Sequence, residues 1–224
     1  MEQVHPARPA AERMVEAQLR PRGITDERVL AAMASLPRHA FLPMPVRDQA
    51  YEDHAVPIGF DVTMSQPFVV AWMTEALALE GDERVLEVGT GSGYQAALLG
   101  RLAREVYTIE RVPVLARRAR FTLKALGIDN VHVFVGDGSL GLPLHAPYDG
   151  ILVTAAAPSV PNELLAQLGR GGRLVVPVGG AGIQSLRLVQ RDEDGQLTIA
   201  DRGGVVFVPL VGERGFHAPR WPHD

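Results

Sequence analysis

The chain has 224 residues, of which 46% are hydrophobic and 21% charged, and it contains no cysteine. These values predict one soluble globular domain with ample apolar material for a core, and they exclude disulfides and thiolate chemistry. The net charge of −4 gives no electrostatic reason to expect a nucleic acid or an anionic membrane as a partner. We find neither an apolar run of the ~18 residues that a membrane span needs nor a signal-peptide core, so we expect a cytoplasmic protein.

The N-terminal part of the chain is predicted to be helical. Residues 10–19 have the apolar spacing of a short amphipathic helix. A second helix follows, with Thr25 as the expected N-cap, acidic residues in its first turn and Pro37 at its end. The sequence therefore predicts a helical addition in front of the rest of the fold.

An irregular segment comes next. Residues 38–62 contain three prolines and follow no helical or strand period, and long irregular segments in compact domains often cover a functional site. Ser65 then precedes a helical pattern that Pro67 opens. From the sequence alone, the ordinary interpretation of Ser65 is an N-cap, because a serine hydroxyl there accepts from the first free N–H groups.

Residues 84–88 form a β-favouring run that leads into three alternating glycines and then a helical pattern. Free backbone N–H groups at such a turn favour an anionic ligand group, and the glycines let it approach closely. A dinucleotide fingerprint needs a small residue at position 94, where this chain has Tyr94, so NAD and FAD are disfavoured. The Glu-x-Gly-x-Gly-x-Gly pattern instead resembles motif I of the class I S-adenosylmethionine (SAM) methyltransferases. An ordinary glycine-rich turn is the alternative.

Chemically useful residues follow the next strands. Glu110 ends the strand predicted over residues 105–110 and lies 21 positions after Gly89, a spacing at which a carboxylate reaches a ribose diol. Asp137 follows a strand predicted over residues 131–135, where it is placed either to accept from an adenine amino group or to serve as a plain turn residue. Small residues at positions 155–157 follow the fourth strand and leave room for a bound group.

The later part of the chain changes period. A fifth strand over residues 173–178 precedes three segments that indicate antiparallel strands, at 185–190, 197–200 and 205–210. Alternating strands and helices followed by hairpins predict an α/β fold: a doubly wound, Rossmann-like parallel sheet with antiparallel strands at one edge and a helical N-terminal addition. Ligands of such sheets bind beyond the carboxyl ends of the strands, where the residues above fall.

These residues allow a closer resemblance to be stated. From about residue 14 to 212, the chain resembles the protein-L-isoaspartate O-methyltransferases. The resemblance lies in residues 63–67, 86–97, 135–138, 148–158, 169–179 and 207–210. The Ser-Gln-Pro segment and the triple alanine are more selective than the glycine loop, which many methyltransferases share.

The resemblance implies one methyltransferase domain over residues 1–224. Its expected parts are a helical cap with a substrate-side segment over residues 1–80, a SAM-binding core over 81–180, antiparallel strands over 181–212 and a tail over 213–224. Ser65 becomes the expected catalytic serine, which can act on substrate while also capping a helix.

The resemblance also assigns the other site residues. The substrate is expected to contact Ser65, Thr63, Val208 and Val211. SAM is expected to contact Thr63, Met64, Glu87, Gly89, Thr90, Gly91, Ser92, Gly93, Glu110, Arg111, Asp137 and Gly138. Within that set, Glu110 would hold the ribose, Asp137 and Gly138 the adenine, and the loop from Gly89 to Gly93 the methionine portion.

The implied reaction is methylation of the α-carboxylate of L-isoaspartyl residues in damaged proteins and peptides, which starts their repair through a succinimide. A carboxylate is ionised at neutral pH and the cofactor carries an activated methyl, so the protein has to place the reactants and exclude water. The seven histidines show no metal-ligand spacing, so we expect no metal. We expect a monomer whose partners are isoaspartyl proteins and peptides, with neither nucleic acid nor membrane.

Three alternatives stay open at this point. One is a SAM methyltransferase for a small molecule or RNA, which the Ser-Gln-Pro segment and the acidic balance disfavour. Another is a peptide-tailoring relative that forms aspartimide in a precursor. The third is a SAM-binding module without catalytic activity, which an intact Ser65, glycine loop and Glu110 argue against.

Overall fold

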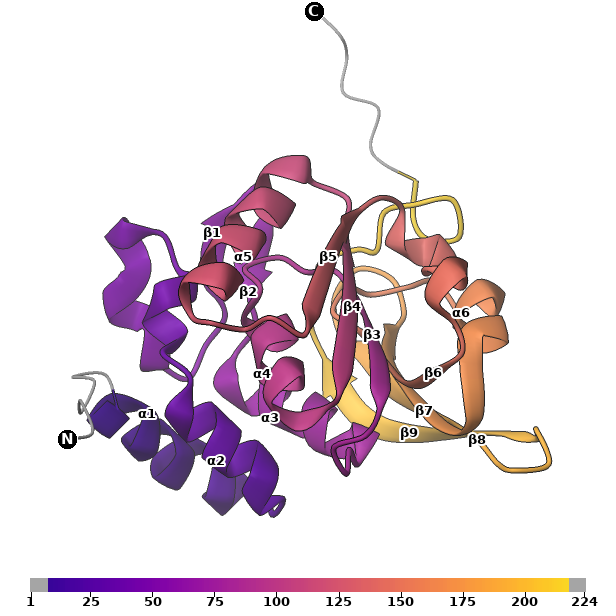
Figure 1. Cartoon of the computed structure of the whole chain (residues 1–224), viewed down its shortest axis with the longest axis horizontal. Helices are drawn as coiled ribbons and strands as arrows, with labels where there is room; N and C mark the ends of the chain where they lie inside the picture. The colour runs from indigo at the N-terminus through magenta and orange to yellow at the C-terminus, as the bar shows by residue number, and fades with distance from the viewer. Residues whose placement is uncertain (1–7, 218–224) are drawn as a thin grey trace, which may run out of the picture.

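The computed structural model describes residues 8–217, shown in Figure 1; the end of the predicted tail, residues 218–224, lies outside them. Within the described residues, seven strands form one mixed sheet in the order β5-β4-β3-β6-β7-β8-β9. The strands are β3 (Arg84–Val88), β4 (Glu105–Glu110), β5 (Val131–Val135), β6 (Tyr148–Val153), β7 (Leu168–Val178), β8 (Gln184–Arg191) and β9 (Leu197–Val205). The first five are parallel, whereas β8 and β9 pair antiparallel at one edge, which confirms the predicted fold class.

The strand order reverses at β3, which lies between β4 and β6. The chain moves outward from β3 through β4 to β5 and then returns to the other side of β3 with β6. Crossover loops leave the sheet in opposite directions at such a point and open a crevice at the carboxyl ends of the strands. The topology therefore places the glycine loop after β3 at the centre of the expected ligand site.

Alternating apolar side chains build a core on each face of the sheet. One core packs sheet residues such as Val85 and Val106 against helices α3 (Pro67–Leu77), α4 (Tyr94–Leu102) and α5 (Pro113–Ala125). The other packs Leu86 and Val88 against α6 (Asn162–Gln167) and neighbouring loops. This arrangement follows from the period of two in each strand, which turns successive side chains to opposite faces.

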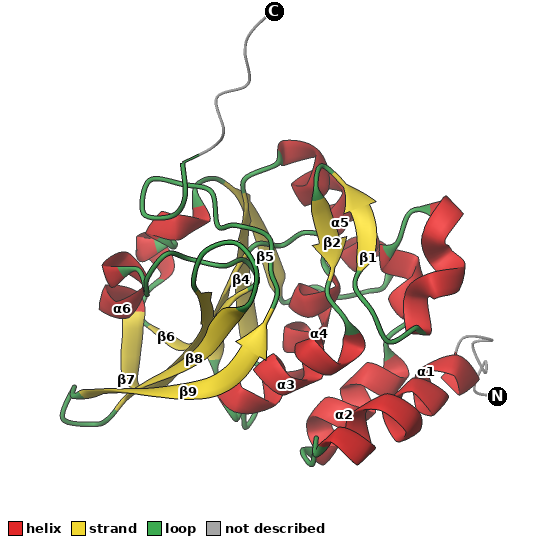
Figure 2. Cartoon of the chain, turned by 180° about the vertical axis from the view of Figure 1, so that it is seen from behind, coloured by secondary structure: helices red, strands yellow, loops and turns green. Residues whose placement is uncertain are grey.

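The N-terminal helices lie beside α3 and α4 rather than on the sheet, as Figure 2 shows from behind. Helix α1 (Arg8–Met14) continues through a π-helical turn, η1 (Val15–Leu19), and a 3₁₀ turn, η2 (Arg20–Arg22), before α2 (Glu27–Ser35). The predicted cap Thr25 is wrong by one residue. The Asp26 carboxylate accepts from the N–H groups of Arg28 and Val29, because its side chain stands directly before the first turn.

The segment predicted to be irregular is ordered locally. It contains two 3₁₀ helices, η3 (Arg38–Phe41) and η4 (Met44–Tyr51), and an antiparallel pair, β1 (Val56–Gly59) and β2 (Val62–Met64). Phe60 and Asp61 form the turn of that pair with φ values of 58° and 56°. Aspartate tolerates the left-handed region but phenylalanine rarely adopts it, so Phe60 hides the hairpin in the sequence.

The C-terminal strands differ from the prediction in one place. Strand β9 extends through Val205, but the strand predicted over residues 205–210 is wrong. That segment instead runs alongside the loop after β6, where the Ala156 N–H donates to the Val208 carbonyl at 2.8 Å and the Leu210 N–H donates to the Ala156 carbonyl at 2.7 Å. Across residues 8–217, the structure has no helix that is both long and apolar enough to cross a membrane.

Candidate active site

A cavity of about 850 Å³ opens at the carboxyl ends of β3, β4 and β6. Its volume lies in the range of pockets for cofactors and small ligands. Many residues that the sequence singles out line it: Thr63, Met64, Ser65, Gly89, Thr90, Gly91, Ser92, Glu110, Arg111, Gly138, Val208 and Val211. The structure thus brings together, in one hollow, residues from five separate parts of the chain.

The glycine loop reaches the cavity through left-handed backbone. Gly89, Gly91 and Gly93 have φ values of 98°, 51° and 87°. At Gly89 an added Cβ would lie 2.4 Å from Oγ1 of Thr154, so the position requires glycine for space as well as for conformation. Gly93 does not line the cavity; its Cα faces Ala119 of α5, where an added Cβ would stand 3.0 Å from the alanine Cβ.

The N–H groups of the three glycines are already used within the protein. They donate to the carbonyl of Ile109, the Glu110 carboxylate and the carbonyl of Thr90, at 2.9, 2.9 and 2.8 Å. The N–H groups of Thr90 and Ser92, which alternate with them, have no acceptor among the described residues. The donors that the loop offers to a ligand are therefore those of Thr90 and Ser92.

Glu110 is held rigidly at the end of β4. Its side chain is buried, its Oε2 accepts from the Gly91 N–H at 2.9 Å and its Oε1 accepts from the Val112 N–H at 2.8 Å. Each carboxylate oxygen has a second acceptor position, and the residue lines the cavity. Glu110 therefore adds a fixed pair of acceptor atoms to the cavity wall.

Glu87 occupies a different place from the one the sequence suggests. It is fully buried beneath the glycine loop and does not line the cavity. The Thr108 hydroxyl donates to it and lies 2.6 Å from the Thr90 hydroxyl, so Glu87 supports the loop through Thr108. Burial, together with the nearby Glu110 carboxylate, raises the pKa of Glu87 to about 8 against the opposing effect of the Thr108 hydrogen bond. Its expected direct contact with a cofactor does not follow from this geometry.

Asp137 is also displaced from the large cavity. It lines a smaller neighbouring hollow of about 440 Å³, which shares Arg111 and Val211 with the first. Its carboxylate accepts from the Glu213 N–H at 2.7 Å and from the Ser139 hydroxyl at 2.6 Å. Partial burial disfavours its charged form, but these hydrogen bonds outweigh burial and hold the pKa of Asp137 below its ordinary value. Its two oxygens thus accept from Ser139 and from the C-terminal segment, while the backbone of Gly138 remains at the cavity wall.

Ser65 faces the cavity without acting as a helix cap. Gln66, not Ser65, is the N-cap residue of α3, so that prediction from the sequence is wrong. The Gln66 side chain turns away to donate to the Asp53 carboxylate at 2.8 Å. The Ser65 hydroxyl has no hydrogen-bond partner in the described part of the chain. A cavity-lining hydroxyl without a partner is free to donate to a ligand carboxylate.

Several residues of the cavity wall have no signal in the sequence. Asp53 and Phe60 reach it from the segment before Ser65, and Ile183 reaches it from the loop before β8. Phe207, from one of the segments that carry the resemblance, also lines the cavity after β9. Phe60 and Ile183 are exposed at 52% and 80%, so the rim of the cavity is apolar. These residues are far from the glycine loop in the sequence, and only the tertiary fold brings them to the rim. The sequence therefore does not reveal that they line the cavity.

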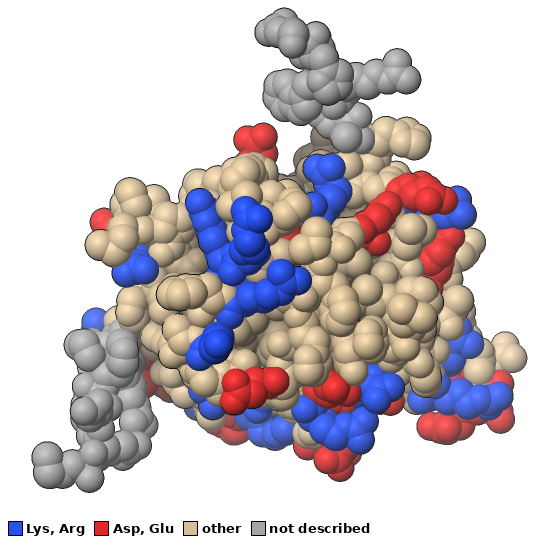
Figure 3. All heavy atoms as spheres, turned by 45° about the horizontal axis from the view of Figure 1, so that its top comes forward, with Lys and Arg blue, Asp and Glu red and all other residues tan. Residues whose placement is uncertain are grey.

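Positive charge gathers beside this rim, over α5, as the space-filling view in Figure 3 shows. Arg117, Arg118 and Arg120 are exposed there, and the guanidinium of Arg118 lies 5.8 Å from the centre of the Phe60 ring. Across residues 8–217, no group of three or more histidine, aspartate or glutamate side chains is placed to bind a metal ion.

The reversed strand order, the glycine loop and the cavity at the strand ends define a class I SAM-dependent methyltransferase. A solved protein-L-isoaspartate O-methyltransferase has the same fold, with a TM-score of 0.81 and 30% identity over 93% of this chain and 67% of that one. A second such structure, from Plasmodium falciparum in complex with S-adenosyl-L-homocysteine, gives a TM-score of 0.78 at 24% identity over 90% of this chain and 98% of its own.

The sequence comparisons are more specific than the fold. Residues 10–215 match the family model of protein-L-isoaspartate(D-aspartate) O-methyltransferase. The protein-L-isoaspartate O-methyltransferase of Methanoculleus marisnigri is 53% identical over 94% of this chain and 96% of its own. That of Methanoregula boonei is 55% identical over 91% of this chain and 94% of its own. The chain therefore belongs to the protein-L-isoaspartate O-methyltransferase family.

Proposed function

We propose that this enzyme transfers a methyl group from SAM to the α-carboxylate of L-isoaspartyl residues in proteins and peptides. The observation that carries the assignment is the free Ser65 hydroxyl at the wall of the cavity that the glycine loop also lines. The resulting methyl ester recloses to a succinimide, whose hydrolysis returns part of the residue to normal aspartate. The proposal agrees with the family of the chain and with its length relative to the curated relatives.

The wall of the cavity fits SAM. The Thr90 and Ser92 N–H groups suit the carboxylate of its methionine portion, and the held acceptors of Glu110 suit the ribose diol. Met64, Arg111 and the Gly138 backbone complete the wall, and we assign Gly138 to the base. When bound, SAM supplies a methyl group that its sulfonium already activates. We assign Glu87 and Gly93 to support of the loop and Asp137 to support of the segment beside the base.

The substrate side of the cavity uses a hydroxyl and main-chain groups. We assign Ser65 to hold the isoaspartyl carboxylate and Thr63 to line its path. Val208 and Val211 line the same cavity, and the Val208 N–H has no acceptor in the part of the chain that the structure describes. Recognition through main-chain hydrogen bonds suits an enzyme whose substrates differ in side-chain sequence.

The methyl transfer does not require an acid–base group of the protein. The acceptor carboxylate is ionised at neutral pH and needs no general base. The protein has to hold its oxygen about 3–3.5 Å from the methyl group and in line with it. The apolar rim around Phe60 and Ile183 would keep water from the site while the peptide is bound.

We also propose which part of the chain forms each part of the enzyme. Residues 1–80 supply the helical cap and the substrate side, 81–180 the SAM-binding core, 181–212 the antiparallel strands, and 213–224 a tail. A monomer in the cytoplasm is our working assembly and location. Light scattering at a mass near 24.2 kDa would support the monomer, and a mass of twice that value would overturn it.

The function is tested by methyl transfer from labelled SAM to an isoaspartyl peptide and to its aspartyl twin. We expect transfer to the first peptide and release of volatile methanol as its ester recloses. Equal transfer to both peptides, or none while SAM binds in calorimetry, would contradict the proposal. A stable aspartimide product without return to aspartate would point to a tailoring enzyme instead.

A further inference from the structure

Arg38 is a charged residue that is fully buried directly behind the cavity. It opens η3, it has 0% of its surface exposed, and it does not line the cavity itself. Its Nε donates to the Ala50 carbonyl at 2.6 Å, and its Nη2 donates to the carbonyl of Ser65. Its guanidinium carbon lies 4.7 Å from the centre of the Tyr94 ring, over the ring face.

The charge of Arg38 has no carboxylate partner within residues 8–217. Burial lowers its pKa, while Tyr94 and Tyr51 oppose that shift, and a guanidinium remains charged under any condition in which a protein folds. Nη1 of Arg38 is buried without a hydrogen-bond partner among the described residues. An unpaired buried charge is costly, and an apolar side chain of similar volume would often serve stability as well or better.

What Arg38 does achieve is to join three segments at the active site. Ala50 belongs to η4, Ser65 precedes α3, and Tyr94 begins α4 directly after the glycine loop. Of the three, Ser65 and Tyr94 line the cavity. The arginine therefore fixes the distance between the segment that carries the serine and the loop that we assign to SAM.

The other end of the serine segment is fixed as well. The Gln66 side chain donates to Asp53, and Asp53 is paired with Arg22 of the helical addition. Arg38 holds the main chain at the Ser65 carbonyl, and Asp53 holds the side chain of the next residue, Gln66. The Ser65 hydroxyl therefore has little freedom except rotation about its own Cα–Cβ bond.

We propose that Arg38 is a positioning residue for methyl transfer: it holds the main chain of Ser65 so that the hydroxyl meets the acceptor carboxylate, and its unpaired charge makes that place favourable for an anion. This inference rests on the proposed role of Ser65. It gives the N-terminal segment a catalytic purpose, because Arg38 and the two residues whose carbonyls it binds, Ala50 and Ser65, lie outside the SAM-binding core.

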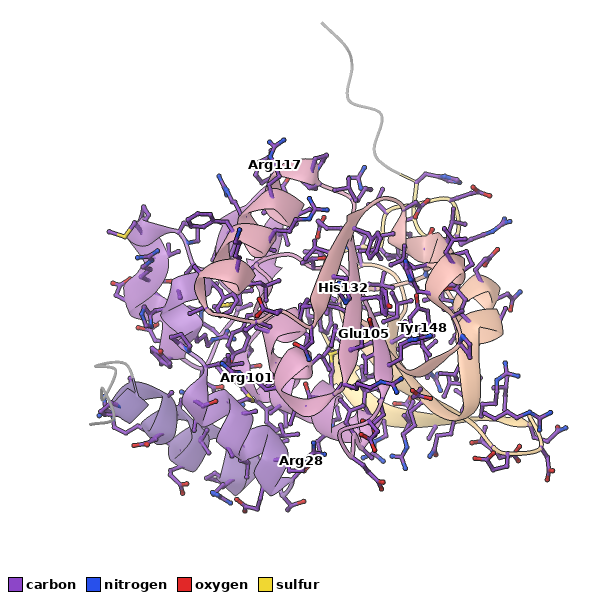
Figure 4. All side chains as sticks on the ribbon, viewed as in Figure 1. Arg28, Arg101, Glu105, Arg117, His132 and Tyr148 are labelled. Carbon is purple, nitrogen blue, oxygen red and sulfur yellow. The ribbon has the colours of Figure 1, made fainter. Side chains whose placement is uncertain are left out.

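The test compares Arg38→Lys and Arg38→Met with a matched control, Arg28→Lys. Arg28, labelled on α2 in Figure 4, likewise joins two carbonyls, those of Leu79 and Leu102, but these precede the amino ends of β3 and β4, away from the cavity. Lysine keeps the charge of Arg38 but cannot reach the Ala50 and Ser65 carbonyls together. Methionine keeps the volume and removes the buried charge.

For each variant we would measure the melting temperature, the SAM dissociation constant, and kcat and KM for an isoaspartyl peptide. We expect both Arg38 variants to bind SAM within about threefold of wild type while kcat/KM for the peptide falls about 100-fold, as misplacement by an ångström can produce. Arg28→Lys should leave kcat/KM within about twofold of wild type.

Two Arg38 variants are used because lysine keeps the buried charge and methionine removes it. If one of them does not fold, the other still tests the proposal. Wild-type kcat/KM in a folded Arg38 variant, or a loss of SAM affinity equal to the loss of kcat/KM, would overturn the proposal.

A double variant separates this inference from the role of Ser65. If Arg38 acts through the serine, Arg38→Lys should lower kcat/KM much less in a Ser65→Ala background than in wild type. Full additivity would overturn the positioning role and leave Ser65 in place. Wild-type activity of Ser65→Ala alone would overturn the assignment of Ser65 and, with it, this inference.

Discussion

Replacement of Glu110 by glutamine tests how the site holds its cofactor. In the wild type, both carboxylate oxygens of Glu110 accept backbone N–H groups, from Gly91 at 2.9 Å and Val112 at 2.8 Å. A glutamine has one acceptor oxygen and turns its amide donors toward the second N–H. One buried N–H then loses its acceptor, at a cost to the free energy of unfolding of roughly 1–3 kcal/mol.

The same change weakens the proposed contact with the ribose. A hydrogen bond to a charged acceptor contributes about 1.5–3 kcal/mol, so its loss corresponds to a roughly 10- to 150-fold rise in the SAM dissociation constant. Isothermal calorimetry with SAM measures the rise, and urea unfolding measures the loss of stability.

Glu105→Gln is the matched control, because Glu105 starts the same strand and pairs with Arg84 and His132 at the end away from the cavity. It should bind SAM within about twofold of wild type. Wild-type SAM affinity in Glu110→Gln, or an equal weakening in both variants, would refute the reasoning.

Three further changes test the surroundings of the site. Because the pKa of Glu87 is raised from 4.5 to about 8, folded Glu87 keeps a proton that the unfolded chain releases between these values. The contribution of this proton to the free energy of unfolding is thus complete below pH 4.5 and is lost toward pH 8, at up to about 1.4 kcal/mol per pH unit. Urea unfolding should show a shallower decrease of stability with pH for Glu87→Gln than for the wild type. An unchanged decrease would contradict the raised pKa. Gly89→Ala should cost roughly 2–5 kcal/mol through its left-handed backbone and its contact with Thr154, with loss of SAM binding, and a wild-type melting temperature would speak against the geometry. Asp26→Ala should cost about 1 kcal/mol as a lost N-cap, more than Thr25→Ala does, and the reverse order would restore Thr25 as the cap.

The sheet could be predicted from the sequence because its signals are local. Strands β3, β4 and β5 have the bounds that apolar runs and terminal glycines or carboxylates indicate, and Glu110 follows from a spacing along the chain. The fold class then follows from the order of elements, since parallel strands bring their carboxyl ends to one edge.

The features that the sequence does not reveal depend on contacts between distant segments. The Asp137 carboxylate accepts from the N–H of Glu213, 76 positions away, and no local pattern reveals such a partner. The burial of Arg38 depends on the Ser65 carbonyl, 27 positions away, whereas arginine in a sequence ordinarily indicates a surface. Ser65 resembles a cap because serine before a helix usually is one, yet Gln66 holds that position here.

The central claim is that Ser65 holds the acceptor carboxylate while the glycine loop and Glu110 hold SAM. It is tested most directly by Ser65→Ala, with separate measurements of kcat/KM for the isoaspartyl peptide and of the SAM dissociation constant, and with Ser185→Ala on β8 as control. Loss of one hydrogen bond to a charged group predicts that kcat/KM falls about 10- to 150-fold while SAM binds as in the wild type. Unchanged kcat/KM, or a loss of SAM affinity that accounts for the whole decrease, would contradict the account.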